Sequence, residues 1–146
     1  MLRLVFGVTA IAWAVLLPLA TWIASERGLP GPLAAFAFVI YRCGSLICHQ
    51  LPERSFHLWA TQMPVCARCT GIYAGGAVAA LGTAVVGRRG RLPVSARTGL
   101  MVASLPTLAT LLVEWATGVM PAGWSRALAG APLGGIIVWI IVRGEA

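Results

Sequence analysis

The side chains best able to do chemistry gather in one segment of this sequence. Residues 42–73 hold all four cysteines and both histidines of the 146-residue chain, with three of its eleven arginines. No cysteine or histidine occurs elsewhere. Thiolates and imidazoles are common ligands of zinc and iron. This segregation therefore indicates one shared site.

Cys66 and Cys69 form a Cys-x-x-Cys pair at the start of an expected helix. This spacing places both sulfurs on one face, where they could chelate one metal ion or close a small disulfide. The free backbone N–H groups of a first helical turn stabilise a thiolate, and Arg68 adds a positive charge beside it. The pair alone does not distinguish metal binding from redox chemistry.

A metal site needs further ligands, and we expect Cys48 to be the third. Adjacent residues on a helix point about 100° apart, so Cys48 and its neighbour His49 do not easily share one ion. The alternatives for the fourth position are His49, Cys43 and His57. The sequence thus predicts a zinc or iron site formed by Cys48, Cys66, Cys69 and His49, with Cys43 or His57 as the alternative fourth ligand.

The same residues also suit a membrane thiol–disulfide oxidoreductase. In that hypothesis Cys66 and Cys69 are the redox pair, Cys43 and Cys48 are the shuttle pair, and a quinone is the cofactor. Arg68 would stabilise a thiolate. Two structural disulfides, Cys43–Cys48 and Cys66–Cys69, remain a third use of the four sulfurs.

A carboxylate in an otherwise apolar stretch is the second unusual feature. Glu114 is the only charged residue between Arg97 and Arg126. Because a charge inside a membrane is costly, it usually faces the bundle interior and has a partner. Arg126 is the expected counter-ion, and a small transporter or accessory subunit that uses Glu114 and Arg126 is a further hypothesis.

The composition determines the kind of fold that must position these residues. Apolar residues make up 59% of the chain and charged residues 10%, whereas soluble chains average about 45–50% and about 25%. Long uncharged stretches are each close to the roughly 20 residues that cross a bilayer. We predict an all-α integral membrane protein of one domain, residues 1–146, a bundle of about four transmembrane helices. The expected crossings are residues 4–24, 67–87, 99–119 and 125–143.

The first loop, residues 25–66, carries three of the four cysteines and both histidines, and Cys69 follows it. Its apolar run from Leu33 is too short to span, so we expect an extra interfacial or re-entrant helix over about residues 33–49. If that helix crosses instead, the N-terminus changes sides. The loop after the second crossing contains four arginines, Arg88, Arg89, Arg91 and Arg97. Such short basic loops stay in the cytoplasm, which places the cysteine loop on the outer side of the cell (inner) membrane.

The net charge of +7 comes from arginines near the predicted membrane boundaries. They act there as topological anchors, and we expect no nucleic-acid partner. The expected partner is the lipid bilayer. Closely spaced glycines and alanines in the second and fourth crossings allow close helix packing, within the bundle or in a homo-oligomer.

Two linked motifs resemble a known family. Residues 48–56 read CHQLPERSF, and residues 62–73 read QMPVCARCTGIY. Together they resemble the signature of the small prokaryotic membrane proteins called domain of unknown function 2085. The resemblance implies a membrane location and no particular activity. The chain departs from the family pattern at Glu114, where an Asp-Gly is expected. The resemblance points to Cys48, His49, Cys66, Arg68 and Cys69. Arg54, which lies in the first motif, is a further candidate site residue.

Overall fold

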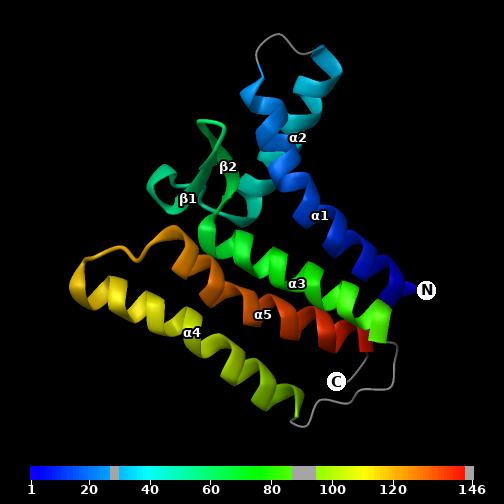
Figure 1. Ribbon diagram of the computed structural model, residues 1–146, viewed down its shortest axis with the longest axis vertical. Coiled ribbons are helices and arrows are strands. Elements are labelled where there is room, and N and C mark those ends of the chain that lie inside the picture. Colours follow the sequence, from blue (N-terminus) through cyan, green and yellow to red (C-terminus); the bar gives the residue numbers. More distant parts are fainter. Residues whose placement is uncertain (27–29, 87–94, 144–146) are drawn as a thin grey trace.

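The computed structural model describes residues 1–26, 30–86 and 95–143, and this part of the chain is mainly helical. Its helices are α1 (Leu2–Ser25), α2 (Gly31–Ile47), α3 (Ala67–Val86), α4 (Ala96–Thr117) and α5 (Gly123–Arg143). Between α2 and α3 lie a short 3-10 turn, η1 (Pro52–Arg54), and two strands, β1 (Ser55–Leu58) and β2 (Thr61–Cys66). α3, α5 and α4 form one layer, and α1 and α2 rise from it as a hairpin (Figure 1).

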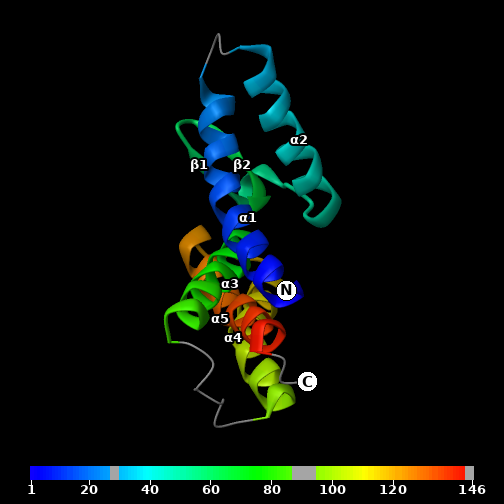
Figure 2. The ribbon, with the colours of Figure 1, turned by 90° about the vertical axis from the view of Figure 1, so that its right-hand side faces the viewer.

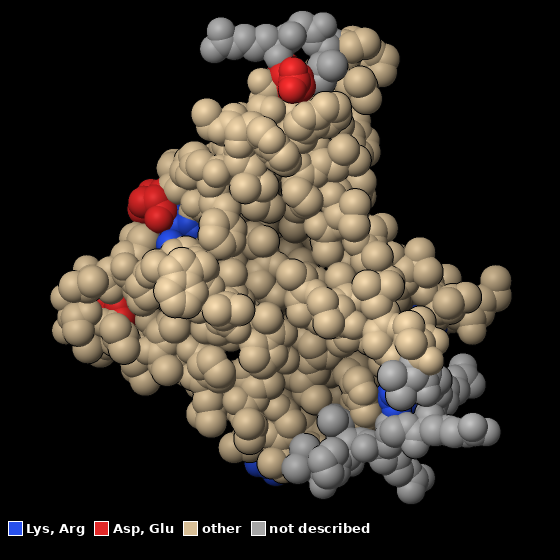
Figure 3. Space-filling view, in the orientation of Figure 1, with Lys and Arg blue, Asp and Glu red and all other residues tan. Residues whose placement is uncertain are grey.

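Within the described ranges, three helices, α1, α4 and α5, are long and apolar enough to cross a membrane. At about 1.5 Å per residue, helices of this length match the roughly 30 Å of a hydrocarbon core. Figure 3 shows a face whose central area carries no acidic or basic side chains, while charged atoms lie near its margins. Such a surface is suited to lipid.

α1, α3, α4 and α5 lie over the four predicted crossings, and α3 occupies the second of those ranges. The number of crossings stays a prediction. The expected short helix is α2, which begins one residue before Pro32, a residue whose fixed φ suits a first helical turn. Arg88, Arg89 and Arg91 of the basic loop lie outside the described residues.

The packing of α3 against α5 depends on glycines. A Cβ at Gly71 or Gly75 of α3 would collide with the backbone carbonyl of Ala127 or Ala131, respectively, on α5. A Cβ at Gly134 would collide with the carbonyl of Ile72. The helices therefore touch backbone to backbone, the arrangement that small residues at four-residue spacing allow. α4 lies on the outer side of α5, and α1 packs on α3 (Figures 1 and 2).

The β-hairpin was not predicted, so the all-α assignment was incomplete. β1 and β2 pair antiparallel, with Leu58 opposite Thr61 and His57 opposite Gln62. Trp59 and Ala60 make the turn with φ of 50° and 59°. Two successive left-handed residues form the tight hairpin turn that normally uses Asn or Gly. Because neither residue stands here, the sequence lacks the usual signal.

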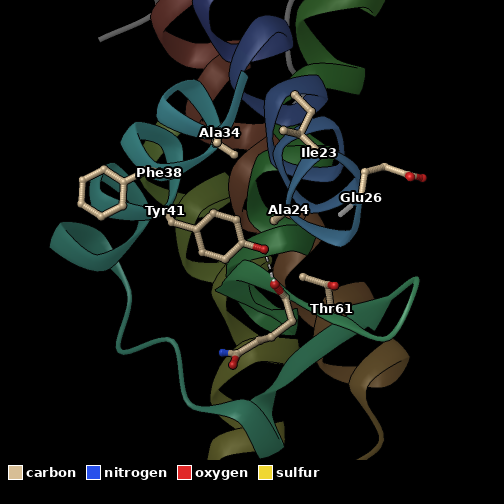
Figure 4. A pocket seen from close by; sticks show the side chains of 9 residues that line it. Ile23, Ala24, Glu26, Ala34, Phe38, Tyr41 and Thr61 are labelled. Atoms are coloured by element: carbon tan, nitrogen blue, oxygen red, sulfur yellow. Dashed lines mark hydrogen bonds between the residues drawn. The ribbon is translucent and has the colours of Figure 1, made fainter. Parts of the chain in front are cut away.

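A hollow of about 510 Å³ lies between α1 and α2, next to the β-hairpin (Figure 4). Ile23 and Ala24 line it from α1, and Phe38 lines it from α2. At its floor the Tyr41 hydroxyl donates a 2.5 Å hydrogen bond to the Gln62 carbonyl oxygen. This bond ties α2 to β2, so the residues that follow α2 have a defined place beside the hairpin.

Candidate metal centre

Three sulfurs converge where α2, β2 and α3 meet. The Sγ atoms of Cys48, Cys66 and Cys69 all lie within 4.8 Å of one another. Cys48 follows the last residue of α2, Cys66 ends β2, and Cys69 lies in the first turn of α3. Ligands at about 2.3 Å from a tetrahedral zinc have sulfurs about 3.8 Å apart. The three side chains are thus within a small adjustment of a metal-binding geometry.

The position of Cys48 depends on a close approach of α2 to β2. Its backbone N–H donates to the Gly44 carbonyl at 2.9 Å, which ends the helix. A Cβ at Gly44 would collide with the Pro64 carbonyl of β2, so only glycine allows this contact. The Cys66 N–H then donates to the Cys48 Sγ at 3.1 Å. Cys48 is 8% exposed and belongs to the buried core.

Two glutamine side chains brace the loop that carries Cys48. The Gln50 Nε2 donates to the carbonyl oxygens of Tyr41 and Pro64 at 2.9 and 2.7 Å. The Gln62 Nε2 donates to the Gln50 carbonyl at 2.6 Å. These roles were not predicted from the sequence, although both glutamines lie inside the two motifs. The available signal in the sequence was that both amide side chains lie between Cys48 and Cys66, inside the two motifs.

The electrostatics of the group favour a thiolate at Cys66. A hydrogen bond from the Cys69 side chain, opposed by partial burial, lowers the pKa of the Cys66 thiol to about 5. The backbone N–H groups of Cys69 and Arg68 and the side chain of Cys48 lower it further. Cys66 is therefore ionised at neutral pH, in the form that binds metals and attacks disulfides.

The candidates for a fourth ligand lie outside the three-sulfur group. His49 is exposed, but it lines the same cavity as the sulfurs. Cys43 and His57 are also exposed, on α2 and β1. Among the described residues only three protein ligands come together, and His49 is the predicted alternative that also lines their cavity. The fourth ligand stays a prediction.

The cavity has a volume of about 340 Å³ and opens directly on the three sulfurs. Its lining also includes Gln50, Leu51 and Ile47. Three arginines from three elements complete it, namely Arg54 of η1, Arg68 of α3 and Arg126 of α5. The site therefore joins soft metal ligands to a strongly basic wall.

Glu114 pairs with two of these arginines, and the prediction of Arg126 as its partner was wrong. Its carboxylate lies 2.5 Å from the Arg54 Nη2 and 3.8 Å from the Arg68 Nη2. Arg68 also donates to the Thr110 hydroxyl at 3.4 Å, so it spans from α3 to α4. Arg126 instead donates to the Glu53 carbonyl at 3.4 Å. The η1 turn brings Arg54 over the end of α4, which no local pattern in the sequence reveals.

Comparisons with known proteins place these features in a family. The family model described as "Predicted membrane protein (DUF2085)" matches residues 48–140. The chain is 58% identical over 36 residues to "Uncharacterized protein MJ1492" of Methanocaldococcus jannaschii, a match covering 25% of this chain and 23% of that protein. It is 59% identical over 29 residues to an "Uncharacterized protein" of Methanothermobacter thermautotrophicus, covering 20% of this chain and 26% of the relative.

The matched segments span about a quarter of each of these relatives. No solved structure matches the chain. The family match runs from Cys48 into α5, so it includes the three clustered cysteines, Glu114 and the three arginines of the cavity. Since it covers well over half of the chain, this protein belongs to the DUF2085 family of predicted membrane proteins.

Proposed function

We propose that this membrane protein binds one zinc ion through Cys48, Cys66 and Cys69. The observation that supports the proposal is the convergence of three sulfurs, from three separate elements, within 4.8 Å. A disulfide uses two sulfurs, so a bridge would leave the third thiol without a role. Three thiolates around one position form a set of soft donors that suits zinc or iron.

The surroundings of the sulfurs also fit a metal centre. Cys66 is already ionised at neutral pH because hydrogen bonds lower its pKa. The adjoining cavity gives the ion a fourth position, for His49, water or another small ligand. Three protein ligands with an open fourth position are the pattern of exchangeable or catalytic zinc sites, whereas structural zinc sites are closed by four protein ligands.

Metal analysis of the purified full chain tests the proposal. We expect one zinc per chain, lost in a Cys66→Ser, Cys69→Ser double variant. Cys43→Ser is the matched control, because Cys43 is exposed and outside the group. It should keep its metal. One iron per chain lost in the same variant would change the ion and leave the site intact, whereas metal-free protein with reactive Cys48, Cys66 and Cys69 would refute the proposal.

A thiol–disulfide oxidoreductase is the second candidate. It is favoured by the hydrogen bond between the Cys66 and Cys69 side chains and by the lowered pKa of Cys66. With Cys66 as the thiolate and Cys69 as the thiol, oxidation of this pair would pass two electrons and the Cys69 proton to an acceptor of the quinone class, and the solvent would supply the second proton of the quinol. Thiol trapping during a redox titration should then give a Cys66–Cys69 couple more oxidising than about −250 mV. The transport hypothesis names Glu114 and Arg126 as its residues, and Glu114 pairs with Arg54 and Arg68 instead of Arg126.

A further inference from the structure

The basic wall of the cavity has more positive charge than its own carboxylate balances. Arg54, Arg68 and Arg126 all line it, and Glu114 pairs with the first two. A divalent metal held by three thiolates carries one net negative charge, and Glu114 carries a second. The three guanidinium groups carry three positive charges, so one positive charge remains. We propose that this cavity binds a small oxyanion of the phosphate type beside the sulfur cluster.

Arg126 gives the clearest evidence for a missing partner. It is only 5% exposed, and among the described residues its side chain donates one hydrogen bond, at 3.4 Å, to the Glu53 carbonyl. Its Nε is buried and has no hydrogen-bond partner among the described residues. A buried guanidinium is costly unless its charge and its donors are satisfied. A neutral carbonyl satisfies one donor and leaves the charge unpaired.

The neighbouring arginines share this feature. The Nε atoms of Arg54 and Arg68 are also buried without a hydrogen-bond partner in the described part of the chain. Guanidinium groups bind phosphate oxygens through two parallel N–H donors, so Nε and one Nη can act together. An oxyanion among the three arginines would accept bonds from these orphan donors.

The volume of about 340 Å³ suits an inorganic oxyanion or the headgroup phosphate of one lipid. Two apolar lining residues, Ile47 and Leu51, are 54% and 40% exposed. They offer a path by which a lipid could enter with its chains outside. Both sources present the same phosphate chemistry to the arginines, and competition between the two distinguishes them.

The anion site adjoins the proposed metal site but does not depend on it. None of its donors is a sulfur. The three guanidinium groups and Glu114 together keep an excess of positive charge when the metal is absent. Phosphate binding is therefore expected in metal-free protein and in the Cys66→Ser, Cys69→Ser variant. Failure of the metal proposal would leave this binding in place, so the two proposals can fail separately.

The test is equilibrium dialysis of radiolabelled inorganic phosphate against the full chain in maltoside detergent, which contains no phosphate. We expect saturable binding of one phosphate per chain. Arg126→Gln should weaken it at least tenfold, and the partly exposed Arg54→Gln should also weaken it. Arg42→Gln is the matched control, because Arg42 is exposed on α2 and outside the cavity lining. It should bind as the wild type does.

Glu114→Gln gives a change of opposite sign. It removes the internal carboxylate that holds Arg54 and Arg68, so phosphate should bind more tightly. A short-chain phosphatidic acid that displaces phosphate at a much lower concentration would identify a lipid headgroup as the occupant. Weaker displacement would identify the free ion. Absence of saturable binding of both probes, or equal binding by wild type and by folded Arg126→Gln and Arg54→Gln, would overturn the proposal.

Discussion

The backbone N–H of Cys66 donates a 3.1 Å hydrogen bond to the sulfur of Cys48, across the junction between β2 and the end of α2. This bond holds the Cys48 sulfur beside the Cys66 backbone without a metal. An N–H donor to sulfur is also a common feature around metal-bound thiolates, where it stabilises the negative charge. The position of the Cys48 sulfur therefore depends on the loop that carries Cys48.

Gln50→Glu should weaken metal binding without removing a ligand. The Gln50 Nε2 donates to two carbonyl oxygens, and a glutamate oxygen at the same place would repel both. Loss of an outer support typically costs about 10–100-fold in metal affinity. Competition with a chromophoric chelator measures this change. Ser45→Ala, which removes only an exposed bond to the Arg42 carbonyl, should leave the affinity unchanged. Unchanged affinity in Gln50→Glu would contradict the bracing role.

Alkylation of metal-free protein should show an ionised Cys66. Its pKa is lowered to about 5, whereas a free cysteine titrates near about 8.5. A lowered pKa favours the thiolate, so Cys66 should stay reactive to iodoacetamide as the pH falls, until about pH 5. Mass spectrometry of the labelled peptide gives the rate at each pH. Cys69→Ala removes the largest cause of the shift and should move the midpoint upward. A wild-type midpoint near that of free cysteine would refute the prediction.

A double-mutant cycle should detect the Arg54–Glu114 ion pair. The Glu114 side chain is 12% exposed and that of Arg54 is 40% exposed, so solvent screens the pair in part. We expect a coupling free energy of about 1 kcal/mol from Arg54→Gln and Glu114→Gln. Unfolding in mixed detergent micelles provides the stabilities. The same cycle with Arg126→Gln should give a coupling close to zero, since Arg126 donates to Glu53 instead. A stronger coupling of Glu114 to Arg126 than to Arg54 would instead support the ion pair expected from the sequence.

Gly134→Ala should destabilise the bundle. The added Cβ would collide with the Ile72 carbonyl, and both backbones would have to separate. Overpacking of this kind typically costs about 1–3 kcal/mol. Gly82→Ala is the matched control, because Gly82 lies on α3 and a Cβ there meets open space. Thermal unfolding should show a lower midpoint for Gly134→Ala only. Equal midpoints would contradict the backbone contact between α3 and α5.

Site-directed labelling tests the predicted orientation. Cys43 is exposed on α2, and Ser95 caps α4 at the opposite end of the bundle, beside the basic loop. In a variant with the other cysteines replaced by serine, a membrane-impermeant maleimide should label Cys43 in spheroplasts, whose cell membrane is intact. A cysteine introduced by Ser95→Cys, with Cys43 also replaced, should react only after the membrane is opened. The opposite pattern would reverse the orientation.

Local properties of the sequence were sufficient for much of the fold. Long apolar stretches with few charged residues located α1, α4 and α5, because a membrane span requires about 20 mainly apolar residues in succession. The Cys66–Cys69 spacing indicated a chelating pair, since residues three apart in a first turn face the same way. The membrane assignment and the family followed from composition and from two continuous motifs.

Only the tertiary structure decided which distant groups meet. The partners of Glu114 are set by the η1 turn and by the first turn of α3, and their positions depend on packing across the whole bundle. The turn at Trp59 and Ala60 carries no glycine or asparagine, so its left-handed backbone is imposed by the strands around it. The basic cavity arises because arginines of three elements face one space beside the sulfurs. Such contacts join residues far apart in the chain, and no local pattern of charge or hydrophobicity specifies them.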